Sequence, residues 1–342
     1  MIEAIHPPGL DLHRLESWWR TGIGAAGPLR ARLLTGGKSN LTYEVTDGSG
    51  SWILRRPPLG HVLATAHDMG REYRVMNALR DTPVPVPATY ALNGDASVIG
   101  APFYVMERVA GTPYRYASEL QALGADRTKS LALRLIDTLA ALHAVDPAAV
   151  GLGDFGRPTG YLPRQLARWH KQMAASKTEE LPAAHELHGR LAVAIPAERP
   201  ATIVHGDYRL DNVLFDAADD QPAAVLDWEM ATLGDPLADL ALMLTYGRLA
   251  LLPTAGIVGD VPRAPGYPRE EEIVDRYAAR SGHDVAGLGF YLGFSAYKLA
   301  AIVEGIRYRH ARGQTVGPGF DGLGDAVDGL LDAGLAAIQK LD

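Results

Sequence analysis

The chain has 342 residues, of which 47% are hydrophobic and 21% charged, and it contains no cysteine. This composition excludes the disordered and fibrous classes, and the lack of cysteine excludes disulfides, thiolate zinc sites and cysteine nucleophiles. The formal net charge of −7, with its acidic excess after residue 107, speaks against nucleic acid as the main partner, because phosphate backbones require basic patches.

The start of the chain has no apolar core of signal-peptide length. No later apolar run approaches the about 18 residues of a membrane-spanning helix. We therefore expect a cytoplasmic protein without a membrane partner. Its oligomeric state stays open between a monomer and a homodimer.

Residues 1–108 have the alternation and turns of a small antiparallel sheet. Its elements are predicted, in chain order, as a helix over 10–22, a strand before the glycine turn 36–40, strands over 41–45 and 52–55, a helix over 68–80, and strands within 84–92 and 101–109. Together they predict a five-stranded antiparallel sheet with one packed helix as a first lobe.

Residues 109–342 are dominated by helical spacing. Helices are predicted over 128–143, 161–175, 183–194, 270–281, 290–312 and 321–341. The segment 203–229 differs, since it has the pattern of short strands and loops. The Pro/Gly-rich stretch 253–269 is a candidate mobile loop near the substrate. The fold class is α+β, with a larger, mainly helical second lobe.

Chemistry-bearing residues gather in the segment 203–229. His205, Asp207 and Asn212 spell H-x-D-x-x-x-x-N after an apolar strand, and Asp227 closes the next one. Phosphoryl transfer from a nucleotide needs a carboxylate that orients a hydroxyl and accepts its proton. It also needs an amide oxygen and a second carboxylate to hold Mg²⁺ on the phosphates. A lone Asp or Asn is more often a turn cap, but the joint spacing predicts a small-molecule kinase.

We assign catalytic roles to three of these residues. Asp207 is expected to orient the substrate hydroxyl and accept its proton, while Asn212 and Asp227 bind Mg²⁺. His205 is expected to brace the loop by hydrogen bonding. The expected cofactors are ATP, with GTP less favoured, and Mg²⁺.

The nucleotide is expected in the first lobe, where the backbone of a glycine turn can approach phosphates. The residues of that turn are Gly37, Lys38, Ser39 and Asn40. A ligand-free glycine hairpin is nearly as good an interpretation of the turn by itself.

Four further residues complete the expected nucleotide site. Arg55 ends the third strand and is expected to hold the α and β phosphates, with Glu72 on the following helix placed to pair with it. The backbone at Glu107 and Val109, at the lobe junction, is expected to bind the adenine edge. The alternative for Arg55 and Glu72 is an exposed ion pair of no consequence.

Four longer motifs carry a family resemblance: GREYRVMNAL, VHGDYRLDNVLFD, VLDWEMATLGDPLADLA and GFSAYKLAAIVEGIRYR. With them, essentially the whole chain resembles the aminoglycoside phosphotransferase family, which shares the protein-kinase-like two-lobed fold with choline kinases. The motifs look like the kinase-like domain found elsewhere fused to acyl-CoA dehydrogenases. The resemblance implies the same roles for Asp207, Asn212 and Asp227, and it implies that Asp235 and Asp239 brace the catalytic loop.

The chain departs from the family pattern in two places. Arg55 stands where most kinases of this fold have lysine, which bears on phosphate geometry and nucleotide choice. The helices from residue 270 onward mix acidic and basic residues, whereas family members that modify drugs use acidic pockets for polycationic sugars. This mixture does not favour an aminoglycoside. The resemblance to the dehydrogenase-fused domains implies a hydroxyacyl-CoA or hydroxyacid, which is the first expectation for the acceptor, and an aminoglycoside or other amino-alcohol is the second.

We predict an ATP-dependent phosphotransferase with a small-molecule hydroxyl as acceptor. The alternative from a different class is a nucleotide-binding pseudokinase that serves as a regulatory module. The joint presence of Asp207, Asn212 and Asp227 argues against it. A protein kinase is less favoured, because no Ala-Pro-Glu anchor follows Asp227.

Overall fold

A computed structural model gives the structure of the chain. The residues it describes are 7–24, 27–34, 40–59, 67–176, 178–251, 259–313 and 322–339. The chain divides into two compact units, Met1–Gly111 with Ala223–Ala231 and Thr112–Pro222 with Thr232–Asp342. Each unit is described by itself.

The first unit contains the antiparallel sheet predicted from the sequence. Its strands are β1 (Arg30–Leu33), β2 (Leu41–Thr46), β3 (Ser51–Arg56), β4 (Thr89–Asn93) and β5 (Phe103–Glu107). They pair antiparallel in the order β1-β2-β3-β5-β4. The prediction of five antiparallel strands is confirmed.

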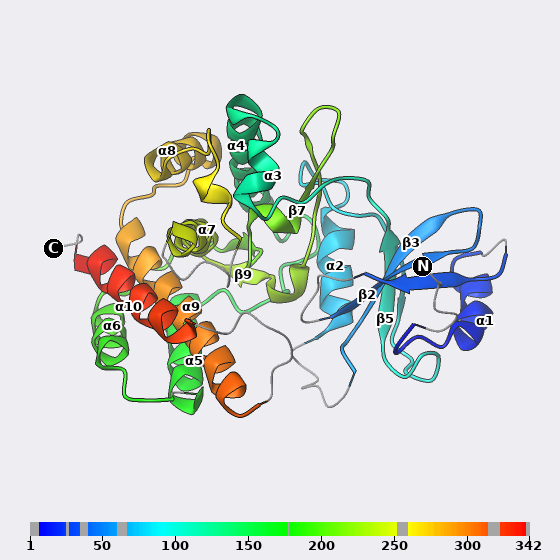
Figure 1. The fold of residues 1–342 in the computed structure, drawn as a ribbon, viewed down its shortest axis with the longest axis horizontal. Helices are drawn as coiled ribbons and strands as arrows, with labels where there is room; N and C mark the ends of the chain where they lie inside the picture. Colours follow the sequence, from blue (N-terminus) through cyan, green and yellow to red (C-terminus); the bar gives the residue numbers. More distant parts are fainter. Residues whose placement is uncertain are drawn as a thin grey trace. The chain divides into compact units, whose positions relative to one another are not determined.

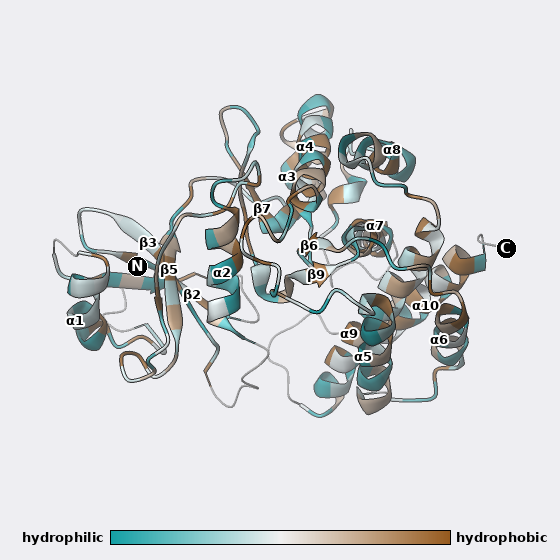
Figure 2. Ribbon diagram, turned by 180° about the vertical axis from the view of Figure 1, so that it is seen from behind, coloured by the Kyte–Doolittle hydropathy of each residue, from teal (hydrophilic) through white to brown (hydrophobic). Residues whose placement is uncertain are grey.

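Two helices cover opposite faces of this sheet, α1 (Leu12–Gly22) and α2 (Met69–Leu79) (Figure 1). Neighbouring side chains of a strand point to opposite faces. Phe103 and Val105 of β5 join the apolar cluster of α1, while Tyr104 reaches α2. Because β5 is buried on both faces, its residues are mostly apolar, as the brown colouring of this strand in Figure 2 shows.

Each of these helices begins at an aspartate cap. Asp11 accepts a hydrogen bond from the Arg14 backbone N–H, and Asp68 accepts one from that of Arg71, both at 3.1 Å. A capped N-terminus satisfies donors that have no partner within the helix. The cap of α2 fixes where the helix begins, and thereby the position of Glu72 in its first turn.

A late segment of the chain returns to the first unit. β8 spans Pro222–Val225, and the 3₁₀ turn η2 spans Trp228–Met230. The backbone N–H of Val225 donates to the Pro85 carbonyl at 2.8 Å, and η2 packs on α2. This return places Asp227 in the same unit as Arg55.

The second unit is mainly helical. Its helices are α3 (Ala117–Gln121), α4 (Ala125–His143), α5 (Tyr161–Ser176), α6 (Pro182–Val193), α7 (Pro236–Leu251), α8 (Glu270–Ser281), α9 (Leu288–Ala311) and α10 (Leu323–Gln339). Its short elements are the strands β6 (Thr202–Val204), β7 (Val213–Phe215) and β9 (Thr232–Gly234) and the 3₁₀ turns η1 (Leu210–Asn212) and η3 (Val261–Arg263). α9 is buried over most of its length and packs against α5, α7 and α10.

Helix α7 was not predicted from the sequence. Its sequence, PLADLALMLTYGRLAL, is apolar on nearly every side because the helix is buried all round. Sequence periodicity detects a helix by its contrast between an apolar and a polar face, and a fully buried helix lacks that contrast. The six helices predicted for this unit are present, with ends that differ by at most a few residues.

The predicted loop 253–269 is only partly described. Residues 252–258 lie outside the described part of the chain, and Val261–Arg263 form η3. None of the described helices combines the length and the apolar character needed to cross a membrane.

Candidate functional site

The segment around Asp207 begins where β6 ends, in the second unit. Gly206 has a φ of 85°, in the left-handed region that glycine adopts without steric cost. The chain therefore turns sharply just before Asp207.

The loop is held by the carboxylate of Asp239, which α7 carries into the core. Asp239 is 1% exposed and accepts hydrogen bonds from the backbone N–H groups of His205 at 2.5 Å and Gly206 at 2.8 Å. Its Oδ2 also lies 3.4 Å from Nε2 of His143 on α4. Burial alone would raise the pKa of Asp239, but His143, the His205 side chain and the Gly206 N–H hold it below its ordinary value. The bracing expected of this carboxylate is present.

Further contacts fix the loop from other sides. His205 is fully buried, and its Nδ1 accepts a hydrogen bond from the Asp207 backbone N–H at 3.3 Å, so it braces the loop as expected. The Lys298 ammonium of α9 donates to the Gly206 carbonyl at 2.8 Å. Burial lowers the pKa of Lys298, while Asp207 and Asp239 act in the opposite direction.

The Asp207 carboxylate has partners on both oxygens. Oδ1 accepts a hydrogen bond from the hydroxyl of Tyr246 at 2.6 Å. Oδ2 lies 3.3 Å from Nδ2 of Asn212 and 3.7 Å from Nε of Arg209. The amide of Asn212 also donates to the Asp207 carbonyl at 2.8 Å. The structure thus brings Asp207 and Asn212 together, with Tyr246 and Arg209 as neighbours that the sequence did not indicate.

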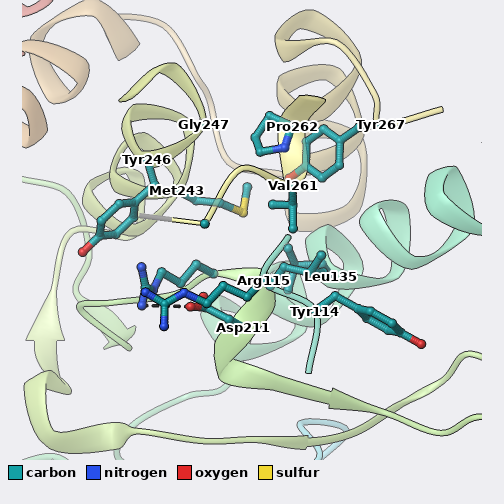
Figure 3. Close-up of a pocket in the computed structure, with 13 residues that line it drawn as sticks. Tyr114, Arg115, Leu135, Asp211, Met243, Tyr246, Gly247, Val261, Pro262 and Tyr267 are labelled. Carbon is teal, nitrogen blue, oxygen red and sulfur yellow. Dashed lines mark ion pairs between the residues drawn. The ribbon is translucent and has the colours of Figure 1, made fainter. Parts of the chain in front are cut away.

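A small pocket, with a cavity volume of about 40 Å³, lies beside these residues and is lined by α7, the Asp207 loop, and segments near residues 115 and 260 (Figure 3). Tyr246 and Arg209 belong to its lining. Arg209 pairs with Asp211 at 3.0 Å, and burial raises the pKa of Asp211 while Arg209 opposes that shift. Nε of Arg115, also in the lining, is buried and has no hydrogen-bond partner within the described residues. Among the described residues that line this space, two arginines and one aspartate are charged.

A second group of predicted residues lies in the first unit, around Arg55. The guanidinium of Arg55 is 10% exposed and lies 3.5 Å from Oε2 of Glu72 and 3.0 Å from Oδ1 of Asp227. The expected pairing of Arg55 with Glu72 is present. Burial alone would lower the pKa of Arg55, but Tyr104 and the two carboxylates raise it, so the guanidinium stays charged.

The backbone at Asp227 is unusual for a residue other than glycine. Its φ of 65° and ψ of 57° are left-handed, which costs about 1 kcal/mol or more even for aspartate. Such conformations persist where the surroundings enforce them. Here the turn η2 and the contact with Arg55 supply that constraint.

Glu72 is the centre of a polar network on the buried side of the sheet. Asn40 donates to Oε1 of Glu72 at 2.9 Å, and the Tyr104 hydroxyl donates to Oε2 at 2.9 Å. The same Asn40 amide lies 3.1 Å from Oε2 of Glu229. Asn40 therefore uses its side chain to connect the strand β2 region with Glu229, two residues after Asp227.

The other residues predicted for the nucleotide site belong to the glycine turn 36–40 and to the end of β5. Gly37, Lys38 and Ser39 lie outside the described residues. Glu107 is the last residue of β5, and its backbone N–H donates to the Ala88 carbonyl at 2.8 Å. Val109 follows two residues later and is half-buried.

Sequence reasoning missed several residues of these networks, among them Tyr104, Arg209, Glu229 and Tyr246. Glu229 carried a usable signal, since it follows Asp227 in the D-x-E pattern. Tyr104 lies in an apolar strand and Tyr246 in the unpredicted α7, so neither had a pattern that marked it.

Replacing Arg55 by methionine is expected to destabilise the protein strongly. It would leave two carboxylates, Glu72 and Asp227, without their buried counter-charge, which costs about 3–5 kcal/mol. The control is Arg32→Met, because Arg32 is 65% exposed and its pair with Glu44 is worth about 1 kcal/mol at most. Urea unfolding measures both, and equal losses would contradict the network.

Replacing Asp239 by asparagine is expected to cost about 1.5–3 kcal/mol at pH 7, because an amide group then faces the loop N–H donors. The pKa of Asp239 is lowered in the folded state, so its charge stabilises the fold above about pH 4. This contribution is lost as the pH falls through the lowered pKa.

The measurement is the free energy of unfolding in urea between pH 7 and pH 3. The difference between wild type and Asp239→Asn should shrink below about pH 4. The exposed Asp325→Asn on α10 serves as the control and should show no such trend. A difference that grows toward acid pH would contradict the assignment.

The chain was compared with known proteins. Residues 30–273 match the model of the phosphotransferase enzyme family. The chain is 37% identical over 301 residues to acyl-CoA dehydrogenase family member 10 of Mus musculus, covering 86% of this chain and 28% of that protein. It is 33% identical over 348 residues to family member 11 of Rattus norvegicus, covering 99% of this chain and 44% of that protein. The chain thus spans less than half the length of these two relatives.

Solved structures share the fold. A Ralstonia eutropha protein provisionally described as an aminoglycoside phosphotransferase superposes with a TM-score of 0.85 at 36% identity, covering 96% of this chain and 98% of that one. A mutant aminoglycoside phosphotransferase, in a ternary complex with ADP and hygromycin B, superposes with a TM-score of 0.61 at 15% identity, covering 95% and 97%. The α+β fold is therefore the kinase-like fold of these enzymes, and the chain belongs to the phosphotransferase enzyme family.

Proposed function

We propose that this chain is an Mg²⁺-dependent kinase that transfers the γ-phosphoryl group of ATP to a hydroxyl of a small molecule. The observation that carries the proposal is the Asp207 loop. Asp239 fixes its backbone, and the carboxylate of Asp207 already accepts a hydrogen bond from a hydroxyl, at 2.6 Å. This distance between the two oxygen atoms lies within the hydrogen-bond reach that a general base needs toward the hydroxyl whose proton it accepts.

Asp207 is the proposed catalytic base. The acceptor oxygen bonds to the γ-phosphorus, the bond between that phosphorus and the bridging oxygen of ADP breaks, and the acceptor proton passes to Asp207. Since the transition state is loose, the main task of Asp207 is to orient the hydroxyl, and the proton moves late.

Asn212 and Asp227 are the proposed Mg²⁺ ligands. Within the described residues, no cluster of three or more His, Cys, Asp or Glu side chains could hold a metal. This agrees with Mg²⁺ held by one or two protein oxygens together with substrate phosphates. Asn212 uses its amide nitrogen for Asp207, which leaves its side-chain oxygen for a cation, and Asp227 offers a carboxylate. When bound, Mg²⁺ would neutralise charge on the phosphates.

The first unit is the proposed nucleotide-binding part. We assign phosphate contacts to Arg55, oriented by Glu72, and to the turn residues Gly37, Lys38, Ser39 and Asn40. We assign adenine contacts to the backbone at Glu107 and Val109. ATP is favoured over GTP, and structural relatives have been crystallised with ADP and with AMP-PNP.

The acceptor we favour is a hydroxyacid or hydroxyacyl-CoA. The pocket beside Asp207 carries Arg115 and Arg209 against a single carboxylate, Asp211, which already pairs with Arg209. A buried Nε of Arg115 that lacks a partner within the described residues suits an anionic group of the acceptor. A polycationic aminoglycoside would meet like charge there. The relatives named as acyl-CoA dehydrogenases agree with an acyl acceptor.

The test is an acceptor screen with γ-labelled ATP and Mg²⁺ over hydroxyacids, hydroxyacyl-CoA thioesters and aminoglycosides. Transfer to the acyl compounds is expected. Asp207→Asn should reduce it by about 10²–10⁴-fold, the usual contribution of a general base. Asp325→Asn should leave it unchanged.

Three outcomes separate the alternatives. Transfer to aminoglycosides alone would replace the acceptor assignment by the amino-alcohol kinase. Nucleotide binding without transfer to any class would favour a regulatory pseudokinase. Full activity of Asp207→Asn would remove the proposed base.

A further inference from the structure

The hydroxyl of Tyr246 occupies the position beside Asp207 that the proposed mechanism requires for the acceptor hydroxyl. Its hydroxyl donates to Oδ1 of Asp207 at 2.6 Å, whereas the other carboxylate oxygen faces Asn212 and Arg209. A phenol on Oδ1 has the chemistry and the distance of an acceptor hydroxyl bound to its base. An acceptor hydroxyl and Tyr246 would thus compete for the same oxygen.

Several contacts hold the tyrosine in this position. It lies on the buried helix α7, which also carries Asp239, so the helix that braces the loop also aims Tyr246 at it. The guanidinium of Arg209 lies 5.0 Å from the centre of the Tyr246 ring, a cation–π distance. Burial raises the pKa of Tyr246 well above its ordinary value, so its hydroxyl remains a donor.

Tyr246 also faces the space through which an acceptor would arrive. It lines the pocket together with Met243 of α7 on one side and Arg115 and Asp211 on the other (Figure 3). A ligand in this pocket would therefore contact Tyr246 and reach Asp207 by displacing the phenol hydroxyl.

We propose that Tyr246 is a specificity-determining residue that caps Asp207 until an acceptor displaces it, and thereby protects ATP from transfer to water. The inference rests on the proposed function. With the cap in place, Asp207 cannot orient a water molecule toward the γ-phosphorus. A bound acceptor exchanges its own hydroxyl for that of Tyr246, so the number of hydrogen bonds to Asp207 is conserved.

Removal of the cap should expose the base to water. In Tyr246→Phe, a water molecule can donate to Oδ1, and hydrolysis proceeds as ATP and water to ADP and phosphate, with the water proton passing to Asp207. The ring and its contact with Arg209 remain, so the change is confined to one hydroxyl.

The experiment measures ADP and inorganic phosphate released from Mg²⁺–ATP without any acceptor, so it does not depend on the identity of the acceptor. Tyr246→Phe should hydrolyse ATP at least about tenfold faster than wild type. Tyr246→Met, which also lacks the hydroxyl, should show a similar increase in the rate of ATP hydrolysis. The matched control is Tyr308→Phe, a tyrosine of α9 whose ring lies 4.1 Å from the Arg312 guanidinium, and it should match wild type. Addition of Asp207→Asn to Tyr246→Phe should abolish the gain, which a purely structural effect would not do.

The possible results separate this inference from the proposed function. If ATP raises the melting temperature of every variant but hydrolysis by Tyr246→Phe stays at or below the wild-type rate, the cap is refuted and the kinase proposal stands. If mass spectrometry finds phosphate on Tyr246 of wild type, Tyr246 is an acceptor and the cap is equally refuted. If no variant binds or hydrolyses ATP, both proposals fail together.

Discussion

The candidate catalytic loop depends on the hydrogen bonds between its backbone and the carboxylate of Asp239. This side chain of α7 is buried and accepts hydrogen bonds from the backbone N–H groups of His205 and Gly206, the two residues before Asp207. A buried carboxylate is stable only with donors around it, and backbone donors in a turn need an acceptor. Each therefore requires the other, and the direction in which Asp207 points follows from this pairing. The same helix supplies Tyr246, so one buried element sets both the backbone of the loop and the environment of its carboxylate.

The first unit is held by a comparable buried charge, but here the charge is positive. One nearly buried cation, Arg55, lies between Glu72 and Asp227, and Asn40 and Tyr104 satisfy the remaining oxygens of Glu72. A buried charge without partners would be costly, so these residues depend on one another for their positions. Arginine suits this role better than lysine because its planar guanidinium can serve two carboxylates at once. The substitution noted in the sequence thus has a structural reason within the unit.

Much of this fold could be predicted from the sequence, because alternation and 3.6-residue spacing mark elements that bury one face. Two helices of the second unit were not predicted: the five-residue α3, and α7, whose uniform burial removes the pattern. The spacing H-x-D-x-x-x-x-N marked Asp207 and Asn212, and the pairing of Arg55 with Glu72 followed from their places on neighbouring elements. Tyr246 could not be predicted, since its contact with Asp207 joins residues 39 positions apart through a helix that the sequence did not reveal.

A thermal-shift titration of wild type and Asp227→Ala with ATP and GTP, each with and without Mg²⁺, would show whether the chain binds a nucleotide through a metal. A nucleotide at a hundredfold excess over its dissociation constant should stabilise the wild type by about 2.7 kcal/mol. We expect an Mg²⁺-dependent shift with ATP that Asp227→Ala loses. A wild type that shows no shift with either nucleotide would contradict the assignment of this chain as a kinase.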